Sequence, residues 1–178
     1  MGNLSNLSTT EPVKTSATNK ELFEFCNRAK ADGLGFAEVG LDLRKLEPGE
    51  GLYHRLKAAQ RPFKATAAHN TNDPATAKRQ WGGVAVVGFE ELVPRVVDTN
   101  EDPEGLGRWV SQVIEGAGDH ILRFVSAYKP CLRRNKKTVY TQQETHFRRQ
   151  KSDREPSQAF LEDLQAAVQR WDEAGEHI

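Results

Sequence analysis

The chain has 178 residues, with 25 basic and 25 acidic side chains and a formal net charge of zero. This length suits one domain with a buried core, and the balanced charge excludes a protein that binds polyanions through its overall charge. Cys26 and Cys131 are too few and too far apart for a disulfide framework or a cysteine zinc site, which favours a reducing compartment. Because the chain shows neither a signal-peptide pattern nor a long apolar run, we expect a soluble intracellular protein, cytoplasmic or nuclear, without membrane contact.

The first predicted elements are a helix over residues 19–30 and a strand over residues 34–37. A capping box opens the helix, and Asp32 and Gly33 break it and turn the chain into the apolar strand. Glu38 ends that strand. Because a carboxylate loses hydration in a core, we expect Glu38 at the strand's carboxyl end, where α/β sheets commonly build their sites. Glu38 is therefore a candidate metal ligand or general base.

Three more elements and a polar loop are predicted up to residue 87. A short helix over 51–59 ends before Pro62, and a strand covers 63–68. Residues 69–80 are polar and predict an exposed loop. A branched apolar strand over 82–87 follows, entered through a glycine pair.

The next part of the chain predicts a hairpin. Residues 98–104 are acidic and contain a proline, which favours a loop, and a strand is expected from 105 to 110. Turn residues at 116–119 then lead into a strand over 121–128. Both faces of that strand are largely apolar, so we place it centrally in its sheet.

The last quarter of the chain combines a basic segment with a final helix. Residues 129–154 carry nine cations, namely Lys129, Arg133, Arg134, Lys136, Lys137, Arg148, Arg149, Lys151 and Arg154. A helix is expected to begin near Pro156, with apolar residues at helical spacing up to Trp171 and Gly175 as its cap.

Five segments, in their order along the chain, resemble a known superfamily. They are QWGGVAVV, GLGRWV, RFVSAYKP, TVYTQQETHF and a helix ending in WDEAGEHI. It is the endonuclease/exonuclease/phosphatase superfamily with the DNase I-like fold, and especially its retroelement-like members. The resemblance covers nearly all of residues 1–178. It implies an α/β fold, a two-layer β-sandwich flanked by helices, in which residues 1–18 are disordered or form a partial first strand.

The resemblance also implies roles for individual residues. Glu38 matches the metal-binding glutamate, for Mg²⁺ or Mn²⁺, and Asn3 matches the active-site asparagine of the first strand. Tyr128 resembles the active-site tyrosine at the end of a central strand. Arg134 falls where some members place a phosphate-binding cation, and Lys136 or Lys137 could serve instead.

One departure from the family concerns the C-terminus. Members continue past the last helix into a strand with an Asp-x-Asn motif and later a catalytic histidine, whereas this sequence stops at Ile178. By resemblance the domain is incomplete at its C-terminus, no general base is assignable, and we expect little or no catalysis from the chain as given.

The sequence thus predicts a fragment of a divalent-metal-dependent phosphodiesterase, most specifically a DNA endonuclease of a mobile element, with no obligate protein partner. A phosphatase or phospholipase of the same superfamily is one alternative. A non-catalytic nucleic-acid-binding remnant that uses residues 129–154 is another, and a protein that exposes the apolar stripe of its last helix to a partner is a third. On the residues alone, Glu38 could be a solvated carboxylate, Tyr128 a tyrosine at the core's edge and Asn3 a disordered terminal residue.

Overall fold

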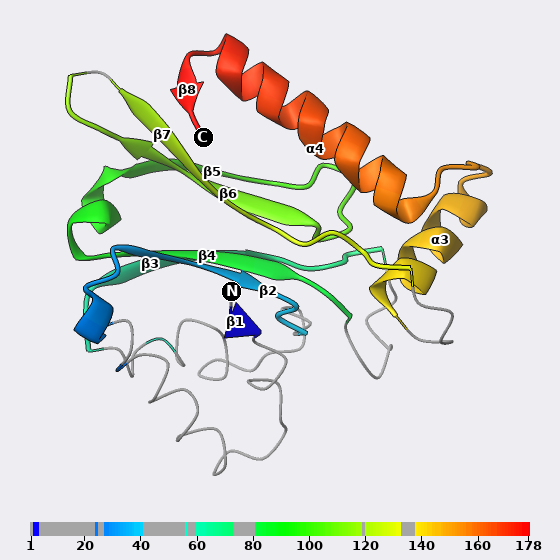
Figure 1. Ribbon diagram of the computed structural model, residues 1–178, viewed down its shortest axis with the longest axis horizontal. Helices are drawn as coiled ribbons and strands as arrows, with labels where there is room; N and C mark the ends of the chain where they lie inside the picture. The colour runs from blue at the N-terminus through cyan, green and yellow to red at the C-terminus, as the bar shows by residue number, and fades with distance from the viewer. Residues whose placement is uncertain are drawn as a thin grey trace.

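The computed structural model describes residues 2–3, 24, 27–40, 56, 60–72, 81–118, 120–132 and 138–178. These residues form two four-stranded β-sheets that pack face to face, with helices outside them (Figure 1). The layers confirm the predicted α/β two-layer sandwich.

The first sheet has the strand order β1-β2-β4-β3. Its strands are β1 (Gly2–Asn3), β2 (Gly33–Ala37), β3 (Phe63–Ala68) and β4 (Val84–Phe89). β1 lies parallel to β2, whereas β4 lies antiparallel to both of its neighbours. β2 and β3 therefore run in the same direction, and their carboxyl ends lie at one edge of the sheet.

The second sheet has the strand order β5-β6-β7-β8. Its strands are β5 (Val96–Glu101), β6 (Trp109–Glu115), β7 (Ile121–Ala127) and β8 (Glu176–His177). β6 and β7 form the predicted hairpin, and β8 pairs with β7 in parallel. Arg123 anchors β8, because its guanidinium donates to both carboxylate oxygens of Glu176, at 2.5 and 2.9 Å, and stacks 4.5 Å from the ring of Trp171.

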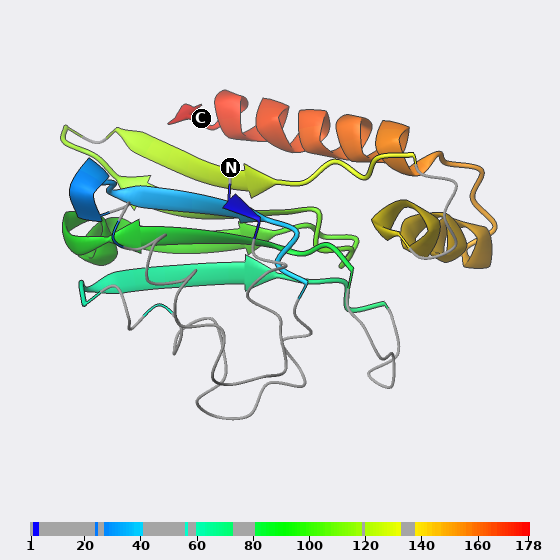
Figure 2. The same cartoon turned by 60° about the horizontal axis from the view of Figure 1, so that its bottom comes forward.

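The helices are the 3₁₀ helix η4 (Glu90–Arg95) and the α-helices α3 (Val139–Arg149) and α4 (Pro156–Glu173). α4 lies along the outer face of the second sheet (Figures 1 and 2), where the ring of Phe160 meets Trp109 edge to face at 6.2 Å between centroids. The final helix and its start at Pro156 are confirmed, and Gly175 follows its end with a φ of 79°.

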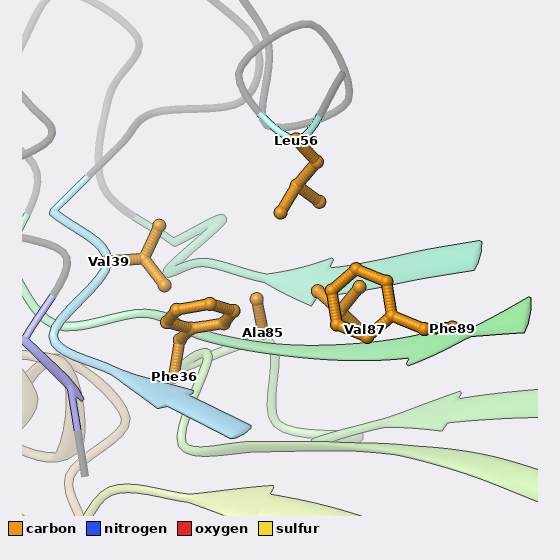
Figure 3. Packing of buried hydrophobic residues seen from close by; sticks show 6 residues of the cluster. All are labelled: Phe36, Val39, Leu56, Ala85, Val87 and Phe89. Carbon is orange, nitrogen blue, oxygen red and sulfur yellow. The ribbon is translucent and has the colours of Figure 1, made fainter. Parts of the chain in front are cut away.

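Apolar side chains fill both faces of the first sheet. Val84, Val86 and Ala68 face the second sheet and pack with Val110. A second cluster covers the opposite face, as Figure 3 shows, and consists of Phe36, Val39, Leu56, Ala85, Val87 and Phe89. Because β4 is covered on both sides, all its residues are buried, which explains its continuous apolar sequence.

Two predicted boundaries are wrong. Residues 98–101, expected in a loop, belong to strand β5, and the strand expected from residue 105 begins at Trp109. β5 is an edge strand with five exposed residues, so acidic and polar side chains are tolerated there and its sequence does not look like a strand.

The two early helices lie mostly outside the described residues. Of the helix predicted over 19–30, residues 24 and 27–29 are described and helical. Of the helix over 51–59, only Leu56 is described, and it is helical and buried. Among the described residues, no helix has the length and apolar character needed to cross a membrane.

Candidate functional site

A hydrogen bond across the sandwich joins the two strongest sequence candidates. The hydroxyl of Tyr128 donates to Oε1 of Glu38, and both side chains are half-buried. Glu38 follows the last residue of β2 in the first sheet, and Tyr128 follows the last residue of β7 in the second. The structure therefore brings together two residues that are 90 positions apart in the sequence.

Strand β7 packs against β2 at two glycines of β2, most closely at Gly33. A Cβ atom on Gly33 would lie 2.5 Å from the Phe124 ring, and one on Gly35 would lie 3.4 Å from the side chain of Ser126. Ser126 in turn donates to the backbone carbonyl of Phe36 at 2.9 Å. Since these contacts advance along both strands together, β2 and β7 run in the same direction and end at the same edge of the sandwich.

The backbone of Glu38 directs its side chain toward this edge. Side chains alternate between faces along a strand, so Glu38 would share the face of Phe36, which belongs to the apolar cluster away from the second sheet. Instead Glu38 adopts a φ of 53°, a left-handed conformation that non-glycine residues rarely adopt. This conformation ends the alternation and lets the carboxylate reach Tyr128 on the second sheet.

Asn3 is placed next to this pair by its backbone. β1 runs parallel to β2 with Asn3 opposite Ala37, the residue before Glu38, so the carboxyl ends of both strands coincide. The side chain of Asn3, and residues Arg134, Lys136 and Lys137, lie outside what the structure describes. Their predicted roles stay predictions.

The basic segment of residues 129–154 is not a uniform cationic surface in its described part. The guanidinium of Arg154 donates to Asp163 at 2.5 Å, and Arg148 forms a surface ion pair with Glu144 at 3.5 Å. Lys129, Arg149 and Lys151 are exposed. Lys129 follows Tyr128 directly, so one exposed cation borders the site.

Next to Tyr128 lies a chain of alternating charges that is buried at Arg108 and Asp102 and partly exposed at Asp163. Arg108 donates to both carboxylate oxygens of Asp102, at 2.7 and 2.8 Å, and to Asp163 of α4 at 2.9 Å. Burial of Asp163 acts to raise its pKa, but the hydrogen bonds from Arg154 and Arg108 outweigh it and hold that pKa below its ordinary value. The backbone carbonyl of Arg108 also accepts the N–H of Tyr128 at 2.8 Å, so this network fixes the strand beside the site.

A metal at this edge would have one described carboxylate. Among the described residues, no group of three or more histidine, cysteine or acidic side chains lies close enough together to hold an ion. One carboxylate does fit Mg²⁺, which keeps several waters and often uses only one or two carboxylates together with substrate phosphate.

Sequence reasoning missed two residues near this edge. Ser126 lies two positions before Tyr128 and therefore on the same side of β7, a signal that strand alternation could have given. Asn70 follows β3 and is 1% exposed, although it falls in a segment predicted to be an exposed loop. Its sequence gives no such signal, because asparagine is typical of exposed turns.

The comparison with solved structures agrees with this architecture. No family model matches the sequence, and a search of curated proteins finds no significant match. The structure is similar to that of an endonuclease/exonuclease/phosphatase family protein from Leptotrichia buccalis C-1013-b, with a TM-score of 0.52 and 14% sequence identity. The alignment covers 80% of this chain and 59% of that one.

The chain has the DNase I-like fold. At 14% identity the likeness concerns the fold alone, and the chain spans less than two thirds of the length of the similar structure. Within the DNase I-like fold, Glu38 and Tyr128 lie where the two sheets meet at the carboxyl ends of their strands.

Proposed function

We propose that this chain carries part of the active site of a divalent-metal-dependent phosphodiesterase, with Glu38 as the ligand of Mg²⁺ or Mn²⁺. The observation that supports this best is the left-handed backbone of Glu38, which turns its carboxylate onto Tyr128 at the open edge of the sandwich. Strained conformations of non-glycine residues are concentrated at functional sites.

The residues have separate tasks in this proposal. The cation, when bound, neutralises negative charge that develops on the phosphate. Tyr128 has a single hydroxyl proton, which it donates to Glu38, so its task is to orient the carboxylate rather than to donate to phosphate at the same time. Asn3, Arg134 and either Lys136 or Lys137 are proposed to bind the phosphate oxygens.

We propose DNA as the substrate. The specific activity would be that of an endonuclease of a mobile element. The likeness of the fold and the exposed Lys129 beside Tyr128 support a polyanionic phosphodiester substrate. None of the residues assigned to the site serves as a general base. We therefore expect hydrolysis by this chain to be weak, and metal binding to be the more sensitive test.

Metal binding tests the role of Glu38 directly. Mn²⁺ titrations followed by electron paramagnetic resonance should show one site in the wild type that is lost in Glu38→Gln and weakened in Tyr128→Phe. Glu91→Gln is the matched control, because Glu91 is an exposed carboxylate in η4, which follows the end of β4 at the opposite edge. Equal Mn²⁺ binding by the wild type and Glu38→Gln would exclude Glu38 as the ligand.

A nicking assay on supercoiled plasmid in Mg²⁺ tests the reaction itself. Any cleavage should be weak, should disappear in Glu38→Ala and should require the metal. Cleavage of equal rate in Glu38→Ala would show that the activity arises elsewhere. Strong Glu38-dependent cleavage would show that the chain needs no further catalytic residues.

The exposed cations favour a second candidate, a non-catalytic nucleic-acid-binding protein. Three cations of the basic segment, residues 129–154, are exposed, namely Lys129, Arg149 and Lys151. In this case binding to a DNA duplex would fall steeply with salt concentration and would be unchanged by Mg²⁺ or by Glu38→Gln. Duplex binding that depends on both Mg²⁺ and Glu38 would favour the phosphodiesterase.

A further inference from the structure

We propose that Asn70 is an additional phosphate-binding residue, whose Nδ2 amide donates a hydrogen bond to a non-bridging oxygen of the bound phosphodiester. This inference rests on the proposed function of the Glu38 site and adds a residue to it.

The orientation of the Asn70 side chain leaves a donor unused. Its Oδ1 accepts the backbone N–H of Asn72 at 2.9 Å, which fixes the amide, since the reversed amide would place two donors against each other. Nδ2 is buried and has no hydrogen-bond partner in the described structure. Buried polar groups are nearly always paired, so an unpaired buried donor calls for an explanation, and a bound ligand is one.

The fold places this donor at the same edge as Glu38 and Tyr128. β3 runs in the direction of β2, so Asn70 follows β3 at the edge where Glu38 follows β2. Alternate residues of β3 face the second sheet, as shown by Ala68, which packs in the cluster that Tyr128 contacts. Asn70 continues that alternation by one step.

The backbone around Asn70 is held on both sides. Gly107 lies so close that a Cβ atom there would be 2.9 Å from the backbone nitrogen of Asn70. The next residue of that segment, Arg108, accepts the backbone N–H of Tyr128. On the other side, Thr71 donates its N–H to Gly105 at 2.8 Å. The segment of Gly107 and Arg108 thus separates Asn70 from Tyr128 and fixes both.

The chemistry of the group selects its ligand. An N–H donor suits an anionic oxygen and cannot coordinate a cation, so the amide complements a phosphate rather than the metal. Thr71 and Asn72, next in the chain, are exposed, so Asn70 stands directly before a solvent-exposed segment. Because Nδ2 is buried, the proposed contact requires a side-chain movement that opens this edge to the phosphate.

Nuclear magnetic resonance tests the contact. The side-chain amide signals of Asn70, assigned by their loss in Asn70→Asp, should move when dimethyl phosphate is titrated in the presence of Mg²⁺. They should stay in place with Mg²⁺ alone. The proposal would be overturned if the chemical shifts of this amide did not change with dimethyl phosphate. It would also be overturned if they changed as much with Mg²⁺ alone.

Binding of a fluorescein-labelled DNA duplex, followed by anisotropy, measures the effect. Asn70→Asp keeps the acceptor for Asn72 but replaces the donor with a negative charge, so the duplex should bind about tenfold more weakly or worse. Asn70→Ser, which also keeps an acceptor, serves if Asn70→Asp does not fold. The matched control is Asn72→Ala, which breaks the hydrogen bond to the carbonyl of Glu104 in the same loop and should leave binding within about twofold.

The outcomes separate this proposal from the proposed function. Wild-type affinity in both Asn70 variants, with binding that still depends on Glu38, would overturn the role of Asn70 alone. Equal weakening by Asn72→Ala would show that Asn70 only supports the loop, which also overturns it. Absence of duplex binding by the wild type would overturn the role of Asn70, whereas the Mn²⁺ titration decides the role of Glu38 separately.

Discussion

Gly33, and not Gly35, limits how closely β2 and β7 approach. A Cβ on Gly33 would enter the ring of Phe124 at 2.5 Å, whereas a Cβ on Gly35 would make an ordinary contact of 3.4 Å with Ser126. Gly33→Ala should therefore lower the free energy of unfolding by about 1–3 kcal/mol, as overpacking usually does. Gly35→Ala, the matched control on the same strand, should lower the free energy of unfolding clearly less. Urea denaturation measures both, and equal losses would contradict the packing argument.

The sequence located Glu38 and Tyr128 but not the conformation that joins them. Apolar residues before each side chain show where a strand ends, and that is enough to place both at strand ends. The left-handed φ of Glu38 is a tertiary effect, because nothing in the local sequence requires it. Asn70 was missed for a similar reason, since its burial depends on Gly107 from a distant loop.

The buried ion pair of Asp102 and Arg108 links the loop between β5 and β6 to helix α4. Both side chains are fully buried, and Asp163 of α4 completes the network. Asp102→Ala would leave the guanidinium without its main partner, so we expect a loss of about 3–5 kcal/mol in the free energy of unfolding.

A surface pair provides the control for this prediction. Arg148 and Glu144 are 74% and 46% exposed, and Glu144→Ala should change stability by less than about 0.5 kcal/mol. Urea denaturation again measures both variants. A similar small change in Asp102→Ala would show that the buried pair contributes no more than the surface one.

Most of the elements follow from their sequences, and the exceptions have physical causes. The strands β2, β3, β4 and β7 and the helix α4 are recognisable from their apolar residues, which form short runs in the strands and repeat at helical spacing in α4. α3 was not predicted as a helix. Its residues are mostly polar, with only Val139, Tyr140 and Phe147 as buried apolar residues, and its capping box pairs Thr138 with Thr141 in place of the usual Glu or Gln.

For the whole molecule, stability should fall in acid in part because of Asp163. Its pKa is lowered in the folded protein, so its contribution is complete above the unfolded value of about 3.9 and disappears as the pH falls through the folded pKa. Between about pH 6 and about pH 3, the urea midpoint of the wild type should fall more than that of Asp163→Asn. Parallel curves would show that Asp163 does not contribute to acid sensitivity.

The two sheets are also joined by polar contacts away from the candidate site. Lys64 of β3 donates to the carbonyl of Val96 at 2.9 Å, and the amide of Gln112 on β6 donates to the carbonyl of Lys64 at 2.9 Å. These bonds need one fixed position of the sheets relative to each other. The sandwich is thus held in register at both ends, which keeps Glu38 and Tyr128 within reach of each other.

The irregular edge strand β5 protects the protein from pairing with other chains. Its register shifts between Val96 and Asp98, and Asp98 and Glu101 are both exposed along the strand. A bulge and charged side chains hinder a second copy from adding its own strand to an open sheet edge. The features that made this segment resemble a loop in the sequence therefore act against aggregation in the folded protein.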